Sequence, residues 1–130
     1  MYNEKVMDIF KNAKNSGMIK NASGKGKVGN VQCGDIMQIY IAVDEKNVIR
    51  DAKFKTFGCV SAIASTDIMC DMIKGKTMDQ ALKISNKEVV DMLGGLPPQK
   101  IHCSVMAAEA VASAIKDCRK KQARAKARAK

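Results

Sequence analysis

The regular alternation of apolar and polar residues in the middle of the 130-residue chain predicts two β-strands. From Asp35 to Val43, apolar side chains occupy every second position, which is typical of a strand with one buried face. Residues 44–47 (DEKN) then have the composition of a turn. Residues 48–57 alternate in a similar way, so we expect a second strand that runs back antiparallel to the first.

Apolar residues at helical spacing predict five helices around this hairpin. Two of them have candidate N-cap residues, Thr77 for one and Ser85 or Asn86 for the next. Residues 15–30 are expected to form a loop, because glycine favours turns and these glycines lack the spacing of a phosphate-binding loop. The proline pair at 97–98 predicts an extended link. The predicted helices cover residues 2–14, 60–73, 78–84, 86–93 and 103–119.

The composition fits one globular domain with a basic end. Hydrophobic residues make up 46% of the chain and charged residues 28%, so a buried core is expected. The formal net charge of +10 is concentrated from Lys116 onward, where eight basic residues accompany one acid. We therefore divide the chain into a domain over residues 1–119 and a basic tail over residues 120–130. The tail has no apolar stripe and is expected to fray or stay disordered.

The N-terminus lacks the basic and apolar regions of a signal peptide, and no apolar run approaches the roughly 18 residues of a membrane span. We therefore expect a cytoplasmic protein with no membrane contact. Five cysteines form an odd set with no secretory context, which favours thiol or metal chemistry over a disulfide framework.

The predicted hairpin brings Cys33 and Cys59 together. If the turn centres between Glu45 and Lys46, the numbers of paired residues sum to about 91, which places Cys33 opposite Gly58. A slip of one or two residues in this register still leaves both thiols at one end of the hairpin.

A third thiol, Cys103, follows His102 at the predicted start of the last helix. Backbone N–H groups and the positive end of the helix dipole favour a thiolate there, so Cys103 is a candidate metal ligand or sulfur acceptor. Asp35 adds an oxygen ligand two residues after Cys33.

Cys70 and Cys118 are excluded from this site by distance. Each lies on a predicted helix, 11 residues after Cys59 and 15 residues after Cys103 respectively, so the separations are roughly 16 and 22 Å. Both are interpreted as small buried or boundary residues.

Three motifs resemble those of U-type iron-sulfur cluster scaffold proteins, the IscU family that includes the N-terminal domain of NifU. They are CGD at residues 33–35, FGCVSAIAS at 57–65 and LPPQKIHCS at 96–104, and the resemblance covers nearly the whole chain. It implies an IscU/SufE-like α+β fold in which a small antiparallel three-stranded sheet packs against four to five helices. It also implies a scaffold, not an enzyme, that assembles a [2Fe-2S] cluster and transfers it to recipient apo-proteins.

By this resemblance, Cys33, Cys59 and Cys103 ligate the cluster, and Asp35 or His102 completes the coordination. Thiolates hold such clusters, and a ligand of another type makes the assembly more labile, which suits a carrier.

The resemblance also implies that Cys103 accepts sulfur as a persulfide from a cysteine desulfurase, with Lys100 holding the anionic intermediate. Asp35 would promote release of the cluster. The family commonly has glycine where this chain has Val60, which could stiffen the ligand loop and alter the rate of cluster exchange.

Scaffolds of the IscU type present a Leu-Pro-Pro-x-Lys segment to an Hsp70-type chaperone, and Leu96, Pro97, Pro98, Gln99 and Lys100 match it. The alternative is a loop stiffened by prolines that has no partner.

Three other functions compete with the scaffold. The same ligands would bind zinc tetrahedrally, and Cys103 could carry persulfide sulfur without any cluster assembly. The basic tail could bind nucleic acid, but three Phe, two Tyr and no Trp leave little to stack on bases, which argues against it.

Overall fold

The computed structural model describes residues 3–30, 35–96 and 98–129, without the side chains of Asn30, Asp35, Gln99 and residues 126–129. The predicted α+β class is confirmed. In chain order, the elements are α1 (Glu4–Lys11), β1 (Gly24–Asn30), β2 (Asp35–Val43), β3 (Ile49–Phe57), α2 (Val60–Ile73), α3 (Met78–Leu82), α4 (Asn86–Met92), the 3-10 helix η1 (Pro98–Lys100) and α5 (His102–Ala129).

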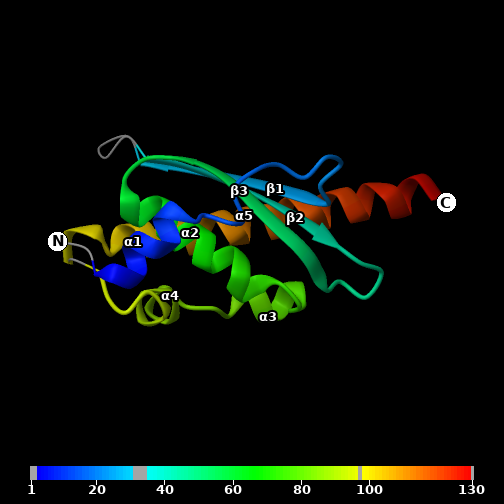
Figure 1. Ribbon diagram of the computed structural model, residues 1–130. Helices are drawn as coiled ribbons and strands as arrows, with labels where there is room; N and C mark the ends of the chain where they lie inside the picture. Colours follow the sequence, from blue (N-terminus) through cyan, green and yellow to red (C-terminus); the bar gives the residue numbers. More distant parts are fainter. Residues whose placement is uncertain (1–2, 31–34, 97, 130) are drawn as a thin grey trace.

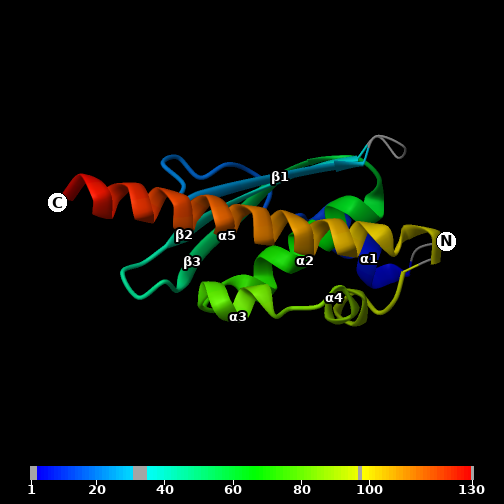
Figure 2. The same ribbon diagram turned by 180° about the vertical axis from the view of Figure 1, so that it is seen from behind.

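The three strands form one antiparallel sheet in the order β1-β2-β3, and helices cover one of its faces (Figures 1 and 2). Helix α5 packs along β1 and β2, whereas α2 packs against β3. The core lies between these two layers and contains large buried side chains such as Met37, Phe54, Met69 and Ile115. Helices α3 and α4 close the far side of the core against α2 and α5.

Strand β1 occupies part of the stretch that the sequence predicted as a loop, so that prediction is wrong for Gly24–Asn30. The two glycines at its start are required by close packing against α5. A Cβ on Gly24 would lie 2.2 Å from the carbonyl oxygen of Ala114, and one on Gly26 would lie 2.3 Å from that of Ala110. Glycine here lets a strand approach a helix closely, instead of marking a turn.

The hairpin is also shifted by two residues from the predicted register. Ile36 pairs with Phe57, so the paired numbers sum to 93 instead of 91. The Asp44 carboxylate accepts hydrogen bonds from the backbone N–H groups of Lys46 and Val48, which organises a longer turn. A bulge between Ala42 and Val43, just before this turn, shifts the pairing further. The residue level with Gly58 is therefore Asp35, not Cys33.

Capping boxes start the two short helices where the sequence predicted N-caps. Thr77 and Gln80 exchange hydrogen bonds at the start of α3, and Ser85 and Glu88 do so at the start of α4. The predicted extended link is wrong at Pro98, which opens the 3-10 helix η1, because the fixed φ of proline suits a first helical position. Pro97 lies outside the described residues.

Helix α5 continues to Ala129, ten residues beyond its predicted end near Arg119. Alanine, arginine, lysine and glutamine all have high helix propensity, and an ion pair between Lys121 and Asp117 supports the exposed part. Arg119 also pairs with Asp79 of α3. Within the described residues, no helix combines the length and apolar character that crossing a membrane requires.

Candidate functional site

Cys59 lies at the junction between β3 and α2. Its extended backbone makes it the N-cap residue of α2, and its carbonyl oxygen accepts the first helical hydrogen bond from Ile63. The thiol therefore lies beside the N-terminal end of a 14-residue helix, where the helix dipole favours negative charge. Cys59 is partly exposed.

Cys103 is the second residue of α5, and its side chain is fully buried. The start of this helix is fixed by Ser104, whose backbone N–H and hydroxyl both donate to the carbonyl oxygen of Ile101, at 3.0 and 2.6 Å. Two helix N-terminal ends thus meet at one place, each bringing a cysteine.

The two sulfur atoms lie 3.8 Å apart. This distance is well beyond an S–S bond of about 2.05 Å, so Cys59 and Cys103 are not joined by a disulfide. Two thiolates bound to one tetrahedral metal ion, with metal–sulfur bonds of about 2.3 Å, would themselves be about 3.8 Å apart. The separation therefore fits a shared metal ion without a change in the position of either sulfur.

Ser61 bridges the two thiols, a contact that the sequence analysis missed. Its fully buried hydroxyl lies 3.0 Å from the Cys59 sulfur and donates to the Cys103 sulfur at 3.3 Å. The sequence did contain a signal for this contact, because Ser61 is the second residue of the helix whose N-cap is Cys59. A donor in this position stabilises negative charge on sulfur.

His102 is the first residue of α5, and its Nε2 atom lies 3.6 Å from the Cys103 sulfur. Its role as a metal ligand stays a prediction. Lys100 ends η1, two residues before His102, and is partly buried.

The remaining predicted ligands fall outside what the structure describes. Cys33 lies outside the described residues, and so does the side chain of Asp35, although the backbone of Asp35 begins β2. Because Ile36 pairs with Phe57, β2 begins at the end of the sheet where Cys59 follows β3. Within the described residues, no group of three His, Cys, Asp or Glu side chains is arranged to hold a metal ion. The full ligand set therefore stays a prediction.

Cys70 and Cys118 lie in the interiors of α2 and α5 and are buried, as predicted. Burial raises the pKa of both thiols above the usual value, so they stay protonated and unreactive at neutral pH.

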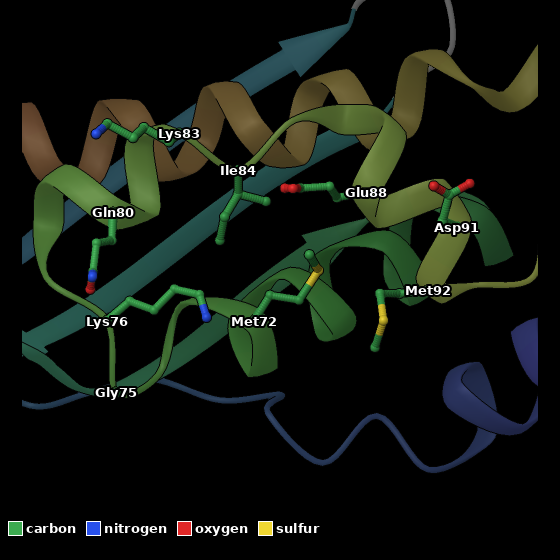
Figure 3. Close-up of a pocket in the computed structure, with 9 residues that line it drawn as sticks. All are labelled: Met72, Gly75, Lys76, Gln80, Lys83, Ile84, Glu88, Asp91 and Met92. Carbon is green, nitrogen blue, oxygen red and sulfur yellow. The ribbon is translucent and has the colours of Figure 1, made fainter.

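A hollow of about 840 Å³ lies between the end of α2, α3 and α4, far from the thiol pair (Figure 3). Met72 and Ile84 supply apolar walls, with Lys76 at one end and Asp91 at the other. Met72 is 13 residues along from Cys59, so roughly 20 Å of helix separates the hollow from the thiols. We therefore place the functional site at the thiol pair.

Comparisons with known proteins agree with the fold and the motifs. Residues 1–125 match the family described as NifU-like N terminal domain. The iron-sulfur cluster assembly scaffold protein IscU 1 of Archaeoglobus fulgidus is 53% identical over 117 residues, which are 90% of this chain and 76% of the relative. The scaffold protein IscU of Aquifex aeolicus is 49% identical, over 95% of this chain and 79% of the relative. A solved structure from the SUF system of Fervidobacterium islandicum AW-1 is 27% identical with a TM-score of 0.74, over 87% of this chain and 95% of that one.

Proposed function

The chain belongs to the NifU-like N-terminal domain family, and on this premise we propose that it is a scaffold on which an iron-sulfur cluster is assembled. The observation that carries the proposal is the pair of thiols 3.8 Å apart at two helix N-terminal ends. Iron prefers thiolate ligands in such clusters, and both helix ends favour the deprotonated form. The cluster is the cargo of this protein.

We propose a [2Fe-2S] cluster, held by Cys59 and Cys103 together with Cys33, and with Asp35 or His102 as the fourth ligand. Support comes from β2, which starts two residues after Cys33 and lies at the Cys59 end of the sheet. The distance from His102 Nε2 to the Cys103 sulfur, 3.6 Å, is short enough for both side chains to serve one metal site.

Cys103 is proposed as the acceptor of sulfur from a cysteine desulfurase. Its thiolate would attack the outer sulfur of the persulfide on the donor enzyme. A new S–S bond forms on Cys103 as that of the donor breaks, and the donor cysteine leaves as a thiolate, so no net oxidation occurs. Because Cys103 is fully buried and Cys59 partly exposed, the incoming donor must displace the cover of Cys103. Lys100, two residues before the helix start, would hold the anionic intermediate.

An Hsp70-type chaperone is proposed to bind the segment Leu96, Pro97, Pro98, Gln99 and Lys100. Pro98 is exposed at the start of η1, whereas Leu96 packs partly against the core. A chaperone that binds Leu96 would therefore pull this side chain from the core and displace the segment that leads into His102 and Cys103. Recipient apo-proteins would take the cluster from the same site.

Anaerobic incubation with ferrous iron, cysteine and a desulfurase tests this function. Visible charge-transfer absorption and matching iron and sulfide contents are expected for the parent protein. Cys59→Ser should abolish the absorption, whereas Cys70→Ser, a buried cysteine on the same helix, should leave it intact. Equal cluster content in both variants would contradict the proposal.

Zinc binding is the second candidate, because a 3.8 Å thiol pair suits zinc equally well. A protein that binds zinc but stays colourless in the iron incubation would favour it. A sulfur carrier without cluster chemistry would instead gain persulfide mass on Cys103 and take up no iron.

A further inference from the structure

We propose that Ser61 is a positioning residue for the metal site, and that its buried hydroxyl donates a hydrogen bond to a coordinated sulfur from the side opposite the metal. This role rests on the proposed function, because it concerns the same thiol pair once the pair is loaded. Ser61 is not a member of the proposed ligand set. It would instead lower the negative charge that the ligand sulfurs carry.

The hydroxyl of Ser61 lies on the buried side of the two thiols. Its oxygen is 3.0 Å from the Cys59 sulfur and 3.3 Å from the Cys103 sulfur, and the two sulfurs are 3.8 Å apart. Ser61 and Cys103 are fully buried, whereas Cys59 is partly exposed. A metal ion that arrives from solvent therefore reaches the thiol pair from the side away from Ser61.

The distances leave no room for a metal ion on the side of the hydroxyl. The Ser61 oxygen lies about 2.5 Å from the midpoint between the sulfurs, and an ion with bonds of about 2.3 Å to both sulfurs lies about 1.3 Å from that midpoint. On the Ser61 side, the ion would overlap the oxygen at roughly 1.2 Å; on the opposite side, the two are roughly 3.8 Å apart. Metal–oxygen ligand bonds are about 2.0–2.2 Å, so Ser61 is a donor behind the sulfurs and not a ligand.

The loaded Cys103 sulfur needs such a donor, because water does not reach it. Cys103 is fully buried, and a buried negative charge is costly unless it accepts hydrogen bonds. The Ser61 hydroxyl already donates to this sulfur, so the contact can persist when metal binds. Hydrogen bonds to the ligand sulfurs are among the factors that tune an iron-sulfur cluster.

The local structure holds the hydroxyl in this place. Ser61 is the second residue of α2, and its full burial restricts its side chain. The thiol of Cys59 makes no capping hydrogen bond to the start of the helix, although Cys59 is the N-cap residue. It lies instead against Ser61 and Cys103.

Ser65, one helical turn later, provides a matched control. It is also a fully buried serine of α2, but its hydroxyl has no hydrogen-bond partner within the described residues. Ser61→Ala and Ser65→Ala therefore remove the same atom from the same helix at the same burial. Only Ser61→Ala removes a hydrogen bond to sulfur.

Cobalt(II) titrations of the parent and of both variants test the role of Ser61. The sulfur-to-cobalt charge-transfer band belongs to the metal-bound form, so its energy reports the charge on the coordinated sulfurs. Without the donor these sulfurs are richer in electrons, so the band of Ser61→Ala should move to longer wavelength. Its cobalt affinity should fall about tenfold or more, as for other hydrogen-bond partners of metal ligands. Ser65→Ala should keep the parent band and, within about twofold, the parent affinity, because it loses no hydrogen bond.

Coincident bands in the parent and Ser61→Ala would overturn the proposal even if affinity fell, because a purely structural effect weakens binding without changing the charge on sulfur. Equal band shifts in the two variants would also overturn it. So would a loss of ligand-field intensity in Ser61→Ala that indicates a change from four-coordinate cobalt, because Ser61 would then be a ligand. The iron incubation is a separate test: a parent protein that binds cobalt but assembles no cluster contradicts the proposed function, and the cobalt bands still decide the role of Ser61.

Discussion

Replacing Gly26 by alanine tests whether the contact between β1 and α5 sets the geometry of the domain. The added methyl carbon would lie 2.3 Å from the carbonyl oxygen of Ala110, 2.4 Å from the backbone nitrogen of Ala114 and 2.9 Å from the Cβ of Ser113. Ordinary contacts of a methyl carbon are at least about 3.4 Å. Two of these atoms belong to the helix backbone and the third is a Cβ, so none of them can move aside without the helix. The strand and the helix must therefore separate by roughly 1 Å.

The size of the effect follows from two opposing contributions. Alanine restricts the unfolded chain more than glycine does, which alone would stabilise the protein by about 0.4–1 kcal/mol. Overpacking of a rigid core costs about 1–3 kcal/mol and occasionally more. Because Gly26 has two overlaps with helix backbone, we place the overpacking cost above that range, at about 4 kcal/mol. The net loss of unfolding free energy is then about 3 kcal/mol, a large part of the roughly 5–15 kcal/mol of a typical domain.

Urea denaturation of the parent and of Gly26→Ala measures this loss as a lower transition midpoint at unchanged slope. Gly75→Ala is the matched control, because no atom lies within 4 Å of its added carbon but its φ of +83° disfavours alanine. That variant should lose only about 1–2 kcal/mol. The close-packing argument is refuted if Gly26→Ala is destabilised no more than Gly75→Ala.

Three further predictions concern the thiols, a buried acid and the predicted cluster-releasing carboxylate. In the metal-free protein, iodoacetamide should modify Cys59 faster than Cys103, because Cys103 is fully buried. The reaction is run under native conditions and followed by peptide mass spectrometry, and faster modification of Cys103 would contradict this prediction. Burial raises the pKa of Asp67 above its usual 3.8, so the protein loses stability as pH rises from 3.8 through the raised value. Asp67→Asn should therefore gain unfolding free energy relative to the parent as pH rises above 3.8 in urea titrations, and a constant difference would contradict this. Asp35→Ala should hold the cluster longer and transfer it more slowly to an apo-protein, and faster loss of visible absorption would refute a role in release.

The sequence was informative wherever local chemistry decides the structure. The extent of β2, the N-caps Thr77 and Ser85 and the burial of Cys70 all follow from periodicity and from polar side chains at helix starts. Each depends on residues close together in the chain, which is why each could be predicted.

The errors came from contacts between distant parts of the chain. Gly24 and Gly26 indicate a loop until the backbone of α5, almost 90 residues later, is known to lie against them. The hairpin register changed because a longer turn shifted it by one residue and a bulge between Ala42 and Val43 by a second, and the side-chain alternation reveals neither. The bridging role of Ser61 likewise required knowing that Cys103 lies beside it.

The separation of the two thiols is a property of the core, not of the site alone. Cys59 is held by the junction of β3 with α2, and Cys103 by the start of α5, whose position is set by the close approach of β1. Folding of the core therefore brings these two ligands to metal-binding distance before any metal is present. Less conformational entropy is then lost when the first metal ion binds. It follows that Gly26→Ala, although its contacts lie about two to three helical turns from Cys103, should weaken cobalt binding to the thiol pair as well as stability. Unchanged cobalt affinity in a destabilised Gly26→Ala protein would show that the thiols are positioned locally.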